Sequence, residues 1–241
     1  MTNLSININK IALLRNSRGR NFPSVESFAE KCLRLGAHGI TLHPRPDQRH
    51  ARYSDVLSLK QLCQSYDREL NVEGFPSQQF IDVVICTQPS QCTLVPDNPA
   101  QLTSDHGWDV RKEQLHLQNV IKQIKAAQVR VSLFIDFDSP DIELAQQLGA
   151  DRIELYTEPY ACAFDSIASQ AILSQFHKAA LTAHELGLGV NAGHDLNLQN
   201  LETFLHIPGI LEVSIGHAFV VECIEFGIEA VMRRYLTIVG R

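Results

Sequence analysis

The chain has 241 residues, a formal net charge of −6 and 44% apolar residues. The mild acidity argues against general nucleic-acid binding, which usually needs a basic face. No apolar run approaches the roughly 18 residues of a membrane span, and the N-terminus lacks the basic and apolar regions of a signal peptide. The six scattered cysteines form no C-x-x-C pair, so we expect reduced thiols in a cytoplasmic protein.

Short apolar runs alternate with helical patterns along the whole chain. The runs predict strands at 5–9, 39–43, 71–73, 92–96, 131–136, 152–156, 189–191 and 212–215. Helices are predicted at 24–36, 56–67, 77–87, 110–127, 139–148, 166–186, 198–205 and 220–238, with Ser24, Ser77 and Ser139 as N-caps. Three similar segments, RLGAHGITL, QLGADRIEL and ELGLGVNAG, place a Gly where a helix ends before a strand.

Eight strand–helix units in 241 residues predict a TIM (β/α)8 barrel, with residues 1–241 as a single catalytic domain. Most strands read as continuous apolar runs, as expected when both faces of a parallel sheet are covered. A doubly wound open sheet is the alternative, but it would carry a Gly-rich phosphate motif after its first strand, and NINKIALLRN has none. The longest loop, 97–109, follows the fourth strand and is predicted to cover a site as a lid.

Polar side chains gather at the carboxyl ends of the predicted strands, where TIM barrels have their active sites. They are Asn7, Asn9, Lys10 and Arg18 after the first strand; His43, Arg45 and His50 after the second; Glu73 after the third; Thr103 after the fourth; His194 after the seventh; and Gly216 with His217 after the eighth. Taken singly, such residues are most often capping or solvated groups. Their recurrence at the same end of most strands favours an active site.

Two kinds of chemistry are represented among these residues. Arg18, Arg45 and the turn at 216–217 before the last helix are predicted anion binders, since a helix N-terminus binds phosphate. Several arginines together with such a turn indicate more than one phosphate. His43, Glu73 and His194 are candidates for proton transfer, because His titrates near neutrality and burial raises the pKa of Glu toward it.

A metal site is the alternative use of the histidines. His43, His50, His194 and His217 could converge on zinc. However, the H-x-H motif that metal-dependent barrels carry on the first strand is replaced by N-I-N, and no H-E-x-x-H occurs. We therefore expect no metal.

Seven stretches, in order along the chain, resemble the pyridoxine 5′-phosphate synthase family: NINKIALLRNSRG, GITLHPRPDQRH, NVEG, CTLVPD, VSLFID, VNAGHDLN and IGHAFV. The resemblance implies a TIM barrel with extra helices that assembles as a homo-octamer and needs no cofactor. It also implies an enzyme that condenses 1-deoxy-D-xylulose 5-phosphate with 3-amino-2-oxopropyl phosphate. The products would be pyridoxine 5′-phosphate, inorganic phosphate and water.

The same resemblance implies roles for individual residues. His43 and Glu73 would accept protons, and His194 would donate one. The amino-ketone phosphate would be held by Asn7, Arg18, Asp195, Gly216 and His217. The deoxyxylulose phosphate would be held by Asn9, Lys10, Arg45, His50 and Thr103.

The chain departs from the family pattern in two places. Familiar members read Asn-Ile-Asp-His where this chain reads Asn7-Ile8-Asn9-Lys10. They usually have Gly where this chain has Asp195, whose carboxylate would repel a phosphate. Two other functions are therefore considered: a Schiff-base aldolase that acts on sugar phosphates through Lys10, and a non-catalytic barrel that binds phosphoesters.

Overall fold

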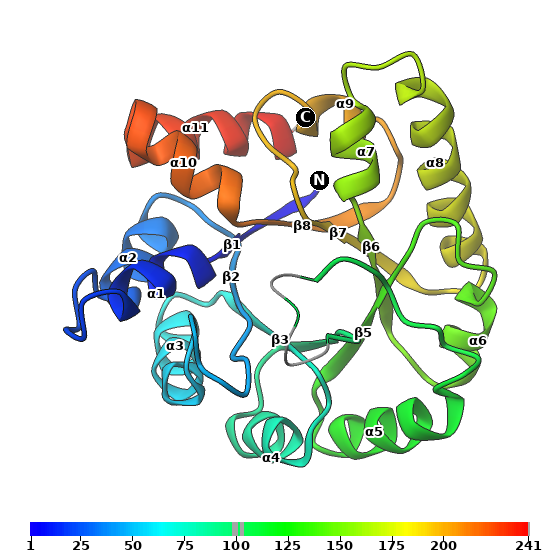
Figure 1. Ribbon diagram of the computed structural model, residues 1–241, viewed down its shortest axis with the longest axis horizontal. Helices are drawn as coiled ribbons and strands as arrows, with labels where there is room; N and C mark the ends of the chain where they lie inside the picture. The colour runs from blue at the N-terminus through cyan, green and yellow to red at the C-terminus, as the bar shows by residue number, and fades with distance from the viewer. Residues whose placement is uncertain (98–100, 102–103, 241) are drawn as a thin grey trace.

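The computed structural model describes residues 1–97, 101 and 104–240. Eight parallel strands in these residues form a closed barrel in chain order, with β8 paired to β1 (Figure 1). They are β1 (Asn3–Asn7), β2 (Gly39–Leu42), β3 (Glu69–Gly74), β4 (Gln91–Leu94), β5 (Arg130–Ile135), β6 (Arg152–Tyr156), β7 (Gly189–Gly193) and β8 (Ile210–Ile215). Each lies at a predicted strand, so the TIM barrel is confirmed.

Eleven helices in the described residues surround the barrel (Figure 1). They are α1 (Asn9–Asn16), α2 (Val25–Arg34), α3 (Tyr53–Ser65), α4 (Gln78–Thr87), α5 (Gln114–Ala126), α6 (Ile142–Gln147), α7 (Glu158–Ala163), α8 (Ser169–Glu185), α9 (Leu201–Phe204), α10 (His217–Phe226) and α11 (Ile228–Val239). Ser24 and Ser77 cap α2 and α4 as predicted. The cap predicted at Ser139 is wrong, because α6 begins only at Ile142.

Three helical features were not predicted. Helices α1 and α7 are additional, and the C-terminal helical pattern is two helices that meet at Gly227, whose φ of +79° breaks the helix. The first strand consequently ends at Asn7 rather than at Asn9. The side-chain oxygen of Asn7 accepts a hydrogen bond from the backbone N–H of Asn9 (3.0 Å), which satisfies a donor at the start of α1. Asn9 and Lys10 therefore lie in the first turn of a helix.

The barrel interior is lined mainly by polar side chains, whereas most apolar side chains of the strands face the helices. Thr93 of β4 donates a hydrogen bond to Glu154 of β6 (3.4 Å), and because β4 and β6 are not neighbours this contact crosses the interior. The hydroxyls of Ser5 and Thr41 also meet there, 2.6 Å apart. The strands thus alternate polar and apolar residues instead of forming the predicted continuous apolar runs. The apolar core fills the layer between the barrel wall and the helices.

No helix within residues 1–97 and 104–240 combines the length and the apolarity that crossing a bilayer requires.

Candidate active site

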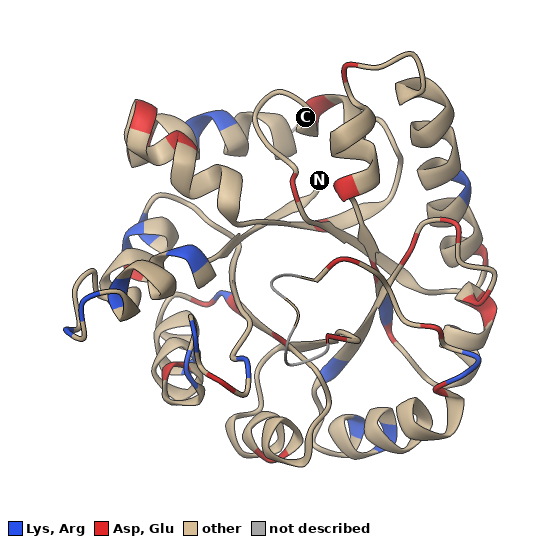
Figure 2. Ribbon diagram, in the orientation of Figure 1, with Lys and Arg blue, Asp and Glu red and all other residues tan. Residues whose placement is uncertain are grey.

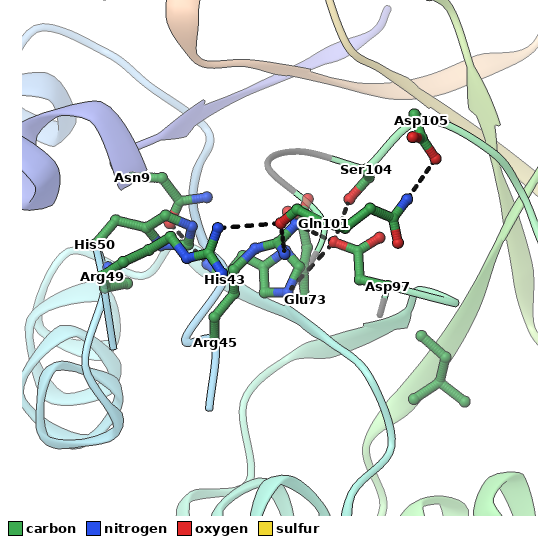
Figure 3. Close-up of polar contacts among 12 residues, drawn as sticks. Asn9, His43, Arg45, Arg49, His50, Glu73, Asp97, Gln101, Ser104 and Asp105 are labelled. Carbon is green, nitrogen blue, oxygen red and sulfur yellow. Dashed lines mark hydrogen bonds and ion pairs between the residues drawn. The ribbon is translucent and has the colours of Figure 1, made fainter. Parts of the chain in front are cut away.

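The loop after β2 carries basic and titratable side chains into the mouth of the barrel (Figure 3). His43 is buried, and its backbone N–H donates a hydrogen bond to the side-chain oxygen of Asn9 (2.9 Å). The rings of His43 and His50 meet edge to face with centroids 5.9 Å apart. Burial, reinforced by Arg45, lowers the pKa of His43 well below its usual value and that of His50 to about 4. Both rings are therefore neutral near pH 7.

Glu73, near the end of β3, is a buried carboxyl. Asn7 donates a side-chain hydrogen bond to it over 3.4 Å. Burial raises the pKa of Glu73 to about 8, the charges of Asp97 and Glu212 add to the rise, and Arg45 opposes it. Glu73 is thus able to exchange a proton close to neutral pH.

Two further carboxyls, which were not predicted from the sequence, lie inside the barrel. Burial, with the charges of Glu73 and Glu212, raises the pKa of Glu154 well above its usual range. Burial also raises the pKa of Glu212 to about 7. Gly193 of β7 leaves room for Glu154, since a Cβ there would lie 2.5 Å from a carboxylate oxygen. The signal available in the sequence was a single Glu inside each of two short apolar strands.

Arg45 is buried and pairs with Asp97, a third carboxylate that the sequence analysis did not single out. The other terminal nitrogen of Arg45 donates to the backbone oxygen of Gln101 (2.7 Å). Ser104 donates to the same oxygen of Asp97 (2.8 Å), which also lies 4.0 Å from Nε2 of His43. Figure 3 shows this cluster within the barrel mouth.

The predicted lid, 97–109, lies partly outside the described residues, which omit 98–100 and 102–103. Thr103, a predicted substrate contact, is therefore also outside them. The end of the loop is anchored by Trp108, whose backbone N–H donates to Phe134 and whose ring N–H donates to Leu94, both over 2.9 Å. The described part of the loop thus lies against the site, and its movement on ligand binding stays a prediction.

His194 follows β7 in a left-handed backbone conformation, with φ of +85°, and Asp195 continues it with φ of +58°. Thr157 donates its hydroxyl to the backbone oxygen of His194, and Asn200 donates its side chain to that of Asp195 (3.1 Å). Asp is among the few residues that tolerate this conformation. The backbone of this turn therefore accommodates Asp195, whose side chain is exposed.

The His194 ring is half-buried beside two aromatic rings. Its centroid lies 5.1 Å from that of Phe134 and 5.4 Å from that of Tyr156. Burial lowers the pKa of His194 to about 4, whereas the neighbouring charge of Asp195 opposes this shift. The ring is neutral near pH 7 in the structure, and added negative charge nearby would raise its pKa.

Gly216 and His217 form the start of α10, next to β1. A Cβ on Gly216 would come 3.2 Å from the Asn7 side chain, so the two residues are in close contact. Free backbone N–H groups at the start of this ten-residue helix make an anion site chemically suitable. The structure therefore brings Asn7 and Gly216 together at the start of α10.

Two further predicted residues belong to α1 and to the segment that follows it. Lys10 is exposed, although its charge contributes to lowering the pKa of His50 and His194. Arg18 is exposed after α1, whereas its neighbour Arg15 is buried and forms an ion pair with Asp55 (2.7 Å). Figure 2 shows lysines and arginines on α1 and after β2, and carboxylates along the loops beside β5 and β6.

Comparisons with known proteins identify the family of this chain. The family described as "Pyridoxal phosphate biosynthesis protein PdxJ" matches residues 4–241. The pyridoxine 5′-phosphate synthase of Parabacteroides distasonis is 49% identical over 236 residues, covering 98% of both chains. That of Xanthomonas campestris pv. campestris is 50% identical over 247 residues, covering 99% of this chain and 96% of the relative.

Among solved structures, the thiamine phosphate pyrophosphorylase from Pyrococcus furiosus is similar with a TM-score of 0.64. The similarity covers 99% of this chain and 95% of that one, but with 14% identity it shows the fold alone. The matched family and the relatives show more than the fold. This chain belongs to the PdxJ family of pyridoxal phosphate biosynthesis proteins.

Proposed function

We propose that this protein forms pyridoxine 5′-phosphate from 1-deoxy-D-xylulose 5-phosphate and 3-amino-2-oxopropyl phosphate, without a cofactor. The observation that carries the proposal is the near-complete match to relatives named pyridoxine 5′-phosphate synthase, at 49% identity. The barrel mouth supports it independently, because it combines buried proton-transfer groups with candidate anion sites. We further propose that residues 1–241 are a single catalytic domain that works in the cytoplasm as a homo-octamer.

The reaction begins when the amine of the amino-ketone attacks the ketone carbon of the deoxyxylulose phosphate. Loss of water then gives a Schiff base, and further proton transfers accompany dehydration, loss of phosphate and ring closure. Each of these steps needs a group that can take up or release a proton near neutral pH. The substrate provides the amine, so no lysine of the protein has to become covalently attached.

Glu73 and His43 act as proton acceptors in this scheme. A neutral imidazole accepts a proton directly, and the lowered pKa of His43 keeps it neutral in the free enzyme. A carboxyl with a pKa of about 8 is a stronger base, once ionised, than an ordinary Glu. The two groups are therefore suited to successive proton removals at one site.

His194 acts as the proton donor. This role requires the imidazolium form, which is disfavoured by burial in the structure. Two phosphate dianions in the mouth would raise the pKa of His194 toward neutrality, adding to the effect of Asp195. Substrate binding thus charges the donor at the stage when it is needed.

The two phosphates bind on different sides of the mouth. The amino-ketone phosphate lies with Asn7, Arg18, Asp195, Gly216 and His217, where the N-terminus of α10 supplies backbone donors. The deoxyxylulose phosphate lies with Asn9, Lys10, Arg45, His50 and Thr103. Asp195 would contribute through its backbone, because its carboxylate would repel a phosphate.

Turnover with both substrates tests the proposal. Purified protein should release pyridoxine 5′-phosphate and inorganic phosphate in equal amounts, and omission of either substrate should abolish both. Binding of both substrates without product would instead indicate a phosphoester-binding barrel. Borohydride trapping of substrate carbon on Lys10 would indicate the aldolase.

A further inference from the structure

Arg45 is already occupied by an anion that belongs to the protein. One of its terminal nitrogens pairs with Asp97, and the other donates to the backbone oxygen of Gln101 over 2.7 Å (Figure 3). Both members of the ion pair are almost fully buried, Arg45 with 4% and Asp97 with 3% of its surface exposed. Both terminal nitrogens of Arg45 are therefore already engaged by acceptors of the protein, so a substrate phosphate has to compete with these acceptors.

The position of the Asp97 carboxylate is itself fixed by further contacts. Ser104 donates its hydroxyl to the oxygen of Asp97 that faces Arg45, over 2.8 Å. Within the described residues, two buried atoms of the pair, Nε of Arg45 and the second oxygen of Asp97, have no hydrogen-bond partner. One oxygen of Asp97 is thus fixed by Arg45 and Ser104, whereas its other oxygen and Nε of Arg45 have no hydrogen-bond partner among the described residues.

We propose that Asp97 is a specificity-determining residue that competes with the substrate phosphate for Arg45. This inference rests on the proposed function, in which Arg45 binds the deoxyxylulose phosphate. In the free enzyme Asp97 takes the place of that phosphate on the guanidinium. A phosphate dianion carries more charge and more acceptor oxygens than one carboxylate, so it displaces Asp97, whereas a singly charged carboxylate ligand does not.

The competition lowers the apparent affinity of the site for phosphate. Phosphate can bind Arg45 only after the Arg45–Asp97 pair breaks, and breaking the pair costs free energy. The state with a free guanidinium is therefore a minor state of the unliganded protein, which weakens the apparent affinity for phosphate. Removal of the carboxylate should therefore strengthen phosphate binding on this side of the mouth. The amino-ketone site, which does not use Arg45, should be unaffected.

Calorimetric binding of inorganic phosphate to the full-length protein tests this inference without requiring turnover. Asp97→Asn should bind phosphate about tenfold more tightly than the wild type. Asp109→Asn, which removes an exposed carboxylate from the same loop, should bind like the wild type. In an Arg45→Gln background, Asp97→Asn should have no effect, since both changes act on one pair.

Kinetics and thermal stability provide second readouts. Asp97→Asn should lower KM for the deoxyxylulose phosphate and leave KM for the amino-ketone unchanged. If the variant is less stable, phosphate should raise its melting temperature more than it raises that of the wild type. Ser104→Ala, which loosens Asp97 but keeps its charge, should tighten phosphate binding in the same direction.

Equal or weaker phosphate binding by Asp97→Asn and Ser104→Ala would overturn the inference, even if the wild type makes product. Absence of product from the wild type would overturn the proposed function instead. If Asp97→Asn binds phosphate more tightly than the wild type, and this gain is lost in the Arg45→Gln background, the competition is supported whether or not the wild type makes product.

Discussion

The backbone N–H of His43 donates a hydrogen bond to the side-chain oxygen of Asn9 over 2.9 Å. The bond joins the first turn of α1 to the end of β2, and it fixes the backbone that carries His43. The family pattern that the sequence resembles has Asp where this chain has Asn9. An amide oxygen accepts the same hydrogen bond as a carboxylate, so the positioning contact is kept while the negative charge is lost.

Asn9→Ala should therefore impair catalysis by releasing His43. Loss of a hydrogen bond of this kind costs about 1 kcal/mol, which corresponds to a fall in kcat of about fivefold. Asn9→Asp is the matched control, because it restores an acceptor of the same size. Steady-state kinetics of both variants test this, and equal kcat in Asn9→Ala and the wild type would show that the contact has no catalytic role.

Glu73→Gln should lower kcat by roughly 10²–10⁴-fold, the usual contribution of general base catalysis. Gln keeps the size and the hydrogen-bonding ability of the side chain but cannot accept the proton. The dissociation constant for the deoxyxylulose phosphate should stay nearly unchanged, because its phosphate is held by other residues. Glu69→Gln, at the opposite end of β3, is the control and should turn over normally. Near-normal turnover in Glu73→Gln would assign the proton transfers to the histidines alone.

The raised pKa of Glu73 should make stability depend on pH. Between its ordinary value of 4.5 and about 8, the folded protein keeps a proton that the unfolded chain has lost. The free energy of unfolding should therefore fall as pH rises through this window, by up to about 1.4 kcal/mol per pH unit. His50 and His194, with lowered pKa values, act in the opposite direction between about 4 and 6.5.

Denaturant unfolding of the wild type and Glu73→Gln across the window isolates the contribution of Glu73, since the histidines are present in both. The difference in unfolding free energy should grow in favour of the variant as pH rises toward 8. A difference that does not change with pH would mean that Glu73 titrates normally.

Arg18 and Arg45 should serve different substrates. Arg18→Ala should raise KM mainly for the amino-ketone phosphate, and Arg45→Ala mainly for the deoxyxylulose phosphate. Each lost charge-assisted contact should cost about 2–3 kcal/mol of binding free energy. If each variant raises both KM values to the same extent, the division of the mouth into two phosphate sites is wrong.

The sequence predicted those parts of the site that lie at strand ends. His43 and Glu73 were found because each comes at or near the end of an apolar run, and the barrel topology brings such ends together. Asn9 was assigned to a strand end because the alternating pattern NIN continues into α1. In the structure the Asn7 side chain accepts a hydrogen bond from the backbone N–H of Asn9, where α1 begins.

The buried positions of Glu154, Glu212 and Asp97 were not predicted from the sequence, for physical reasons. Glu154 and Glu212 lie within strands, and their inward direction becomes clear only when the barrel closes. The role of Asp97 depends on the path of its loop, which brings the carboxylate onto Arg45. That path is set by tertiary contacts rather than by the local sequence pattern.

The fate of the amine nitrogen of the amino-ketone phosphate tests most directly whether this protein forms pyridoxine 5′-phosphate. The amino-ketone phosphate, labelled with ¹⁵N at its amine, should be incubated with the deoxyxylulose phosphate and the protein, and the products followed by NMR. The proposed function predicts that the label appears in the aromatic ring nitrogen of pyridoxine 5′-phosphate, with one inorganic phosphate released for each ring formed. Recovery of the label as unreacted amine, with both substrates bound, would contradict it.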